Sequence, residues 1–112
     1  MMEEVLSMSQ VSQLAHSYEL HQEQEYGLVV ERLAKKYNLT KREEEILLML
    51  ALYGHSNEEL SKKLFVSQTT IKNHIHNMLK KTKASSTREL LSMVLNSFYE
   101  LKCKNPMMRT YS

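Results

Sequence analysis

The stretch GHSNEELSKKLFVSQTTIKNHIHNMLKK, residues 54–81, decides the fold. Ser56 is followed by Glu59 at the spacing of a capping box, which predicts a short helix over residues 57–65. A further capping hydroxyl, Ser67, comes only a residue or two beyond that helix and opens a second helical segment. A tight turn around Val66 therefore joins the two helices, which is the spacing of a helix-turn-helix.

Another helix is predicted directly ahead of this pair. Thr40 stands at its N-cap position and Glu43 follows three residues later, which repeats the capping-box spacing. Gly54 supplies the left-handed cap that a larger residue disfavours, so this helix ends at about Tyr53.

A fourth helix is predicted after the helix-turn-helix. Ser85 and Ser86 open it, and Glu89 lies at capping distance from Ser86. Apolar residues then recur at spacings of three and four, namely Leu90, Leu91, Val94, Leu95 and Phe98. This stripe needs a packing partner. Pro106 and the polar last residues predict a frayed tail.

The sequence before residue 38 predicts one or two further helices. Apolar residues at helical spacing indicate a helix over about residues 25–36 and another over about residues 9–20. The two segments are either separate or one continuous helix, because Gly27 weakens a helix without breaking it.

We therefore expect an all-α fold, which the composition of two glycines and one proline in 112 residues also favours. Its predicted parts are an N-terminal helical extension or linker at residues 1–37, a four-helix domain at 38–100 and a C-terminal tail at 101–112.

Three features argue against a membrane or secreted protein. The longest apolar run, residues 46–52, is much shorter than the roughly 20 residues of a membrane-spanning helix. The start, Met1-Met2-Glu3-Glu4, lacks the basic region of a signal peptide. Cys103 is the single cysteine and fits a reducing compartment, so we expect a cytoplasmic protein.

The formal net charge of +2 conceals a segregation of charge along the chain. Residues 1–31 contain glutamates but no lysine or arginine, whereas residues 60–87 contain lysines but no acidic residue. The second segment is therefore either an ordinary solvated surface or one that meets a polyanion.

The helix that follows Ser67 has two different faces. One face carries donors without any acidic residue, in the order Thr69, Lys72, Asn73, His76 and Lys80. The opposite face is apolar and carries Ile71, Ile75, Met78 and Leu79.

The polar face suits the major groove of DNA, where base edges present acceptors. The small polar residues of the first turn, Ser67, Gln68, Thr69 and Thr70, let the helix N-terminus approach a phosphate. The later cations, Lys80, Lys81 and Lys83, are expected at backbone phosphates.

A metal site and an enzyme active site are the competing interpretations. His74 and His76 are two residues apart and point in different directions on a helix, and no Cys, Asp or Glu lies nearby, so no metal site is expected. His74 is instead expected at the edge of the packed face, with a hydrogen-bond partner. Glu43, Glu44 and Glu45 fit a capping role better than catalysis, and no nucleophile, phosphate loop or cofactor motif is present.

The ordered motifs resemble the LuxR-type helix-turn-helix of bacterial transcription regulators, over about residues 38–98. They read Leu39-Thr40-x-Arg42-Glu43-x-Glu45-Ile46-Leu47, then Gly54-x-Ser56-Asn57-x-Glu59-Leu60, then Val66-Ser67-x-x-Thr70-Ile71-Lys72-x-His74. The resemblance implies a four-helix domain that binds double-stranded DNA through its third helix, at about residues 68–82, and forms a homodimer through its fourth.

The resemblance also implies roles for individual residues. The positions that face bases hold Lys72, Asn73 and His76. The positions that face phosphates hold Ser67, Gln68, Thr69, Thr70 and Lys80, with Lys62 as a weaker candidate. The dimerising positions hold Leu91, Val94, Leu95 and Phe98. No catalytic residue, metal or cofactor is implied.

One departure concerns an ion pair. Family members usually carry an arginine after the third helix that pairs with a glutamate of the first, but here that position holds Thr87 and Arg88 comes one residue late. Either Arg88 reaches Glu43 by a small shift, or the ion pair is lost and the glutamate meets water.

The other departure is the lack of a sensor domain, because 37 preceding residues are too few to form one. The chain is thus an effector domain excised from a larger regulator or a small stand-alone regulator. Its acidic N-terminal segment could lie against the basic face, extend a dimer or simply pack. The alternative function is a protein-interaction module that keeps this fold but binds and modulates a partner regulator.

Overall fold

The computed structural model describes residues 7–104, except for the side chains of residues 8–22 and Lys104. Its described part contains five helices: α1 (Met8–Tyr37), α2 (Lys41–Tyr53), α3 (Asn57–Leu64), α4 (Gln68–Thr82) and α5 (Thr87–Lys104). No strand occurs among these residues, so the predicted all-α fold is confirmed. Of the C-terminal tail predicted at residues 101–112, residues 101–104 belong to α5, and the remainder lies outside the described residues.

The predicted helix starts are confirmed in detail. Thr40 and Ser56 each accept a hydrogen bond from the backbone N–H of the glutamate three residues later, and that glutamate accepts one from the N-cap backbone in return. Ser67 caps α4 by accepting a hydrogen bond from the Thr70 backbone N–H at 3.1 Å, without the return bond of the other two caps. Gly54 ends α2 in the left-handed conformation, with φ of 62°.

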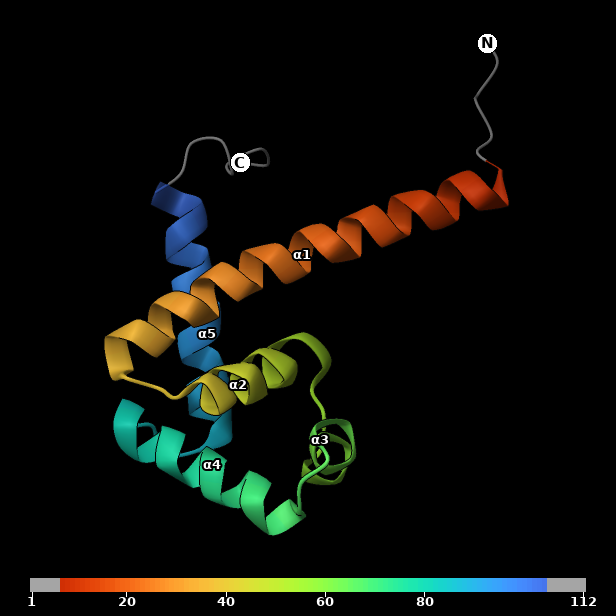
Figure 1. Cartoon of the computed structure of the whole chain (residues 1–112). Helices are drawn as coiled ribbons and strands as arrows, with labels where there is room; N and C mark the ends of the chain where they lie inside the picture. Colours follow the sequence, from red (N-terminus) through yellow and green to blue (C-terminus); the bar gives the residue numbers. More distant parts are fainter. Residues whose placement is uncertain (1–6, 105–112) are drawn as a thin grey trace.

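The N-terminal helix is continuous. The two alternatives for residues 9–36 are resolved in favour of one helix, α1, which passes through Gly27 and ends before Asn38, whose φ is 56°. Figure 1 shows the first half of α1 extending away from the other four helices, while its second half crosses α2 and α5.

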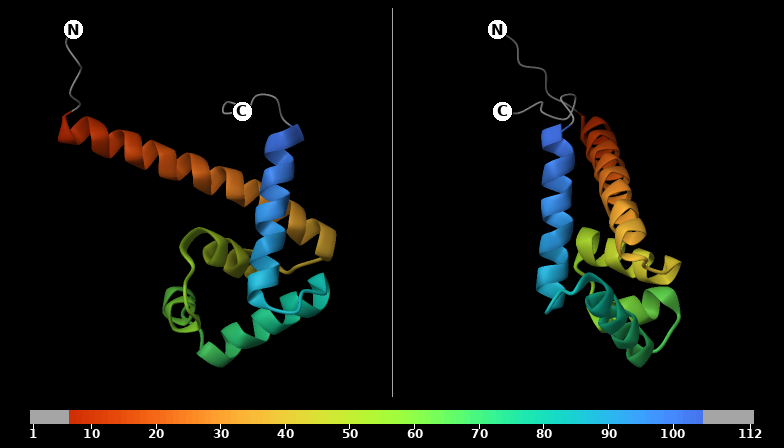
Figure 2. Two further views of the ribbon diagram at one scale, coloured as in Figure 1. Left: turned by 180° about the vertical axis from the view of Figure 1, so that it is seen from behind. Right: turned by 90° about the vertical axis from the view of Figure 1, so that its left-hand side faces the viewer.

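One hydrophobic core holds all five helices together. α1 contributes Val29, Val30 and Leu33, and the other helices contribute residues such as Ile46 and Ile71 that have no exposed surface. α5 packs on α1 and α4, and the two further views in Figure 2 show it rising from the end of α4 to cross α1. The core therefore fixes α4 at one side of the molecule, with α3 beside it.

The helix-turn-helix consists of α3, a short turn and α4. Phe65 ends α3 in the left-handed conformation, with φ of 57°, and its side chain is 94% exposed. Val66 N–H donates to the Ser61 carbonyl at 3.1 Å, and the Ser61 hydroxyl donates to the Val66 carbonyl at 2.5 Å. These bonds close the turn that leads from α3 into α4.

None of the described helices combines the length and apolar character needed to cross a membrane.

Candidate nucleic-acid interface

The N-terminus of α4 is polar and open to solvent. Ser67, Gln68 and Thr69 are exposed, and the Ser67 and Thr70 hydroxyl oxygens lie 2.9 Å apart. The first turn holds no acidic residue, so the free N–H groups and the positive end of the helix dipole meet no side-chain anion of that turn. An anion such as a phosphate would be stabilised at this end.

The two faces of α4 are separated as predicted. Ile71 and Met78 are fully buried, and Ile75 and Leu79 are partly buried against the core. The opposite strip, which we call the α4 strip, is exposed to solvent and consists of Thr69, Lys72, Asn73, His76 and Lys80. A helix that is anchored in this way presents these side chains outward as a group.

The two histidines of α4 differ in exposure. His76 is exposed within the α4 strip, whereas His74 is half-buried at the edge of the packed face. Within the described part of the chain, no three His, Cys, Asp or Glu residues gather in a way that could hold a metal ion.

The cations near α4 are divided by whether they have a carboxylate partner. Lys62 is predicted to contact the DNA backbone, and its Nζ atom lies 3.3 Å from Glu58 Oε1 of the same helix. Within residues 23–103, no carboxylate pairs with Lys63 of α3 or with three lysines of the α4 region, Lys72, Lys80 and Lys83. The sequence interpretation missed Lys63, because Glu58 and Glu59 stand four residues before Lys62 and Lys63 alike. The structure separates the two lysines, since Glu59 is engaged in the capping box with Ser56 and Glu58 is the one that pairs with a lysine.

The contacts of Lys81 contradict the prediction that this residue binds a DNA phosphate. Its Nζ atom donates to Glu43 Oε1 of α2 at 2.7 Å, and the side chain of Glu43 is only 2% exposed. The same carboxylate oxygen accepts from the backbone N–H of Thr40 at 2.8 Å. Glu43 therefore caps α2 and also ties that helix to the C-terminal turn of α4.

The ion pair changes the electrostatics of Glu43. Burial on its own would raise the pKa of this carboxyl group, but the hydrogen bonds from Lys81 and Thr40 and the charge of Lys81 together hold the pKa below its usual value. Glu43 is thus an ionised group inside the domain, and Lys81 is its counter-ion.

The two alternatives for Arg88 can now be judged. Arg88 is exposed in the first turn of α5, and among the described residues no ion pair joins it to Glu43. Glu43 accepts hydrogen bonds from Thr40 and Lys81, so its pair with an arginine is lost. The expectation that water would take the place of the arginine is wrong, because Lys81 does so. Lys81 takes over the role from the last turn of α4, six residues before the usual arginine position at Thr87, because its side chain reaches Glu43 of α2.

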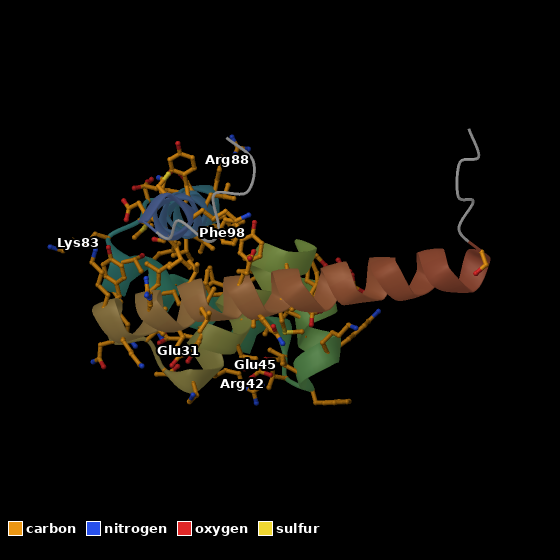
Figure 3. The ribbon with its side chains drawn as sticks, turned by 90° about the horizontal axis from the view of Figure 1, so that it is seen from above. Glu31, Arg42, Glu45, Lys83, Arg88 and Phe98 are labelled. Carbon is orange, nitrogen blue, oxygen red and sulfur yellow. The ribbon has the colours of Figure 1, made fainter. Side chains whose placement is uncertain are left out.

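The residues predicted to dimerise lie in different environments. Val94 is 1% exposed within the core, and Phe98 stacks on Tyr26 of α1 with ring centroids 4.4 Å apart. Figure 3 shows Phe98 between α5 and α1. These two residues thus pack within the chain, Val94 in the core and Phe98 against α1, and their part in a dimer stays a prediction. Leu91 is partly buried, and Leu95 remains 58% exposed.

Comparison with known proteins gives one family. The model described as "Bacterial regulatory proteins, luxR family" matches residues 37–94. The chain is 39% identical over 67 residues to an uncharacterized transcriptional regulatory protein, YxjL, of Bacillus subtilis, covering 60% of this chain and 29% of YxjL. It is 41% identical over 54 residues to the CsgBAC operon transcriptional regulatory protein of Escherichia coli, covering 48% and 24% of the two chains.

A third relative is the response regulator protein TmoT of Ectopseudomonas mendocina, which is 35% identical over 71 residues, or 62% of this chain and 32% of TmoT. The matched segments thus span between 24% and 32% of the length of these relatives. No solved structure matches the chain significantly.

Proposed function

The chain belongs to the luxR family of bacterial regulatory proteins, and from this premise we propose that it is a transcription regulator that binds double-stranded DNA with α4 in the major groove. Its relatives are named as transcriptional regulators or response regulators. A protein with this function works where bacterial DNA is, in the cytoplasm. No catalytic role is proposed.

One observation carries the proposal, namely the exposed and acid-free α4 strip on a helix whose other face is fixed in the core. Lys72, Asn73 and His76 occupy its middle and are proposed to address base edges. Lysine and asparagine can each donate to acceptors in the groove, and His76 donates from at least one ring nitrogen at any pH.

The ends of the strip are proposed to contact the DNA backbone. Ser67, Gln68, Thr69 and Thr70 surround the helix N-terminus, where a phosphate accepts hydrogen bonds from the backbone and the hydroxyls. Lys80 is proposed to bind a phosphate at the other end. Lys81 is left out of this set because Glu43 already neutralises it.

We further propose that two copies associate through the outer face of α5. Leu95 and Tyr99, one turn apart on the same face of α5, are 58% and 70% exposed, so two large apolar side chains lie next to each other on this face. Leu91 lies one turn before Leu95 on the same face. A two-fold pair of α5 helices would bury this surface and place two α4 helices on neighbouring half-sites.

Selection of bound sequences from a pool of random duplexes at low salt tests the proposal. The expected result is an enriched motif with two related half-sites, bound with an affinity that falls steeply as salt rises. No enrichment, together with a stoichiometric protein partner that stays bound at high salt, would instead establish the protein-interaction alternative.

A further inference from the structure

The first half of α1 has no packing partner among the described helices. Figures 1 and 2 show it extending away from the other four helices. The Tyr53 hydroxyl of α2 donates to Glu23 Oε1 at 2.6 Å, and Tyr26 packs against the core. Residues 8–22 therefore form about four turns, or about 22 Å of helix, beyond the point where α1 leaves the domain. A helix of about 15 residues gains little stability by itself in water, so a packing partner would stabilise this segment.

The sequence of this segment carries an apolar stripe. By helical register, one side of α1 holds Val11, Leu14, Ala15 and Tyr18. Val29, which is 1% exposed, comes five full turns after Val11 and so lies on the same side. The stripe thus continues the side by which α1 packs on the core, into a region that the other four helices do not reach.

The stripe fits a second copy of itself. Its spacings are three, one and three residues, so the pattern is the same when it is read in either direction. In an antiparallel pair of these segments, Val11 of each copy comes opposite Tyr18 of the other, and Leu14 comes opposite Ala15. Each layer then sets a larger residue against a smaller one, which favours close packing. A two-fold interface demands such self-complementarity, because both copies use the same patch.

The charges of α1 favour the antiparallel orientation. Residues 8–18 contain no charged side chain, and the glutamates follow at Glu19, Glu23 and Glu25. In a parallel pair, each glutamate would lie beside its counterpart and repel it. In the antiparallel pair, like-numbered glutamates are at least about 13 Å apart along the axis, which exceeds the Debye length of about 8 Å at physiological ionic strength. A strongly charged partner, by contrast, would find no counter-charge along the stripe.

We propose that the first half of α1 binds the same segment of a second copy in antiparallel orientation, through Val11, Leu14, Ala15 and Tyr18. This inference does not depend on DNA binding and goes beyond the proposed function. It uses a different helix from the outer face of α5, so the two contacts together would link dimers into larger assemblies. With four residues from each copy, the contact is much smaller than the standard interface of about 1,600 Å², so association through α1 alone is expected to be weak.

Disulfide formation between introduced cysteines tests the orientation, in a Cys103→Ser background that removes the single native cysteine. A disulfide needs Cα atoms within about 7 Å of each other. Leu14→Cys should form a linked dimer, since residue 14 of both copies lies next to the two-fold axis. Val11→Cys should link to Tyr18→Cys in an equimolar mixture but not to itself, because the two residues 11 are about 10 Å apart along the axis. Gln13→Cys, on the opposite side of the helix, is the control and should stay unlinked.

Sedimentation of a chain whose α5 contact is removed by Leu95→Glu gives a second measurement. In that background, Leu14→Glu should abolish the remaining concentration-dependent association, whereas Gln13→Glu should keep it. Both variants should keep the parent melting temperature and the affinity for one DNA half-site, so a failure here leaves the proposed function intact. Self-linking of Val11→Cys, equal linking of Gln13→Cys and Leu14→Cys, or equal sedimentation of the two glutamate variants overturns the inference. A chain that neither links nor associates also overturns it and assigns the stripe to another protein.

Discussion

At the scale of single residues, the ion pair of Glu43 and Lys81 has the largest consequence. It joins residues that are 38 positions apart in the sequence, and it holds a nearly buried carboxylate against the last turn of α4. Breaking such a pair is costly because the remaining charge stays in a poorly solvated place. The pair therefore adds to the stability of the domain and ties the C-terminal turn of α4 to α2.

Lys81→Met should lower the free energy of unfolding by about 2–4 kcal/mol, because Glu43 loses its counter-ion while it remains enclosed. Urea unfolding measures the change. Lys35→Met is the matched control, since it breaks the exposed pair with Glu31 at 3.2 Å and should cost at most about 0.5 kcal/mol. Equal losses in the two variants would show that Glu43 is not effectively buried.

The lowered pKa of Glu43 also predicts how stability depends on pH. Because the folded pKa lies below the unfolded value of 4.5, the unfolded chain takes up a proton first as the pH falls. The stabilisation by ionised Glu43 is therefore complete well above pH 4.5 and is lost as the pH falls through the folded pKa. Glu43→Gln should show a shallower loss of stability below pH 5 than the wild type in urea titrations. Parallel curves would contradict the assignment.

At the scale of helices, most of what the sequence predicts is local. The capping of α2, α3 and α4 follows from a hydroxyl and its partner within three residues, and the structure forms each of these caps. Lys81 is different, because its partner comes from another helix and no spacing in the sequence brings the two together. The role of α1 was similarly hidden, since its apolar spacing does not say that Tyr26 would meet Phe98.

The cap of α4 should matter for both folding and binding. Ser67→Ala removes the acceptor of the Thr70 N–H and should cost about 1 kcal/mol of stability. It should also weaken binding to specific and non-specific duplexes equally, because a phosphate contact carries no sequence information. Ser86→Ala is the control, since it removes the corresponding acceptor of Glu89 N–H in α5. Ser86→Ala should lose a similar amount of stability but keep the wild-type affinity for DNA. The affinities of the two variants are compared at a temperature at which both variants are folded.

At the scale of the whole molecule, all five helices contribute to the core, whereas the proposed DNA surface comes from α4 with α3 beside it. α1 and α5 complete the core, while α3 and α4 form the helix-turn-helix on the other side. The matched family segment begins at residue 37, yet Val29, Val30 and Leu33 ahead of it are buried. The second half of α1 is thus an integral part of this domain.

If two copies associate through α5, loss of the dimer should weaken binding to a duplex with two half-sites but not to a duplex with one. Leu95→Glu should lower self-association in analytical ultracentrifugation and should weaken binding to a duplex with two half-sites, while affinity for one half-site stays unchanged. Leu28→Glu is the matched control, because Leu28 of α1 is 57% exposed and Leu95 is 58% exposed. If Leu28→Glu alone disrupts the dimer, the two copies meet through α1.

The central claim is that the α4 strip distinguishes one DNA sequence from another. The most direct measurement compares how tightly the wild type, Lys72→Ala and Lys80→Ala bind two duplexes. One duplex carries the selected sequence and the other a scrambled sequence of the same length, and all affinities are measured at one salt concentration. Lys72→Ala should reduce the ratio of the two affinities by about 5- to 150-fold, which corresponds to about 1–3 kcal/mol. Lys80→Ala should weaken both duplexes by the same factor and leave the ratio unchanged. A wild type that binds both duplexes equally, or a ratio that Lys72→Ala leaves intact, would contradict the account.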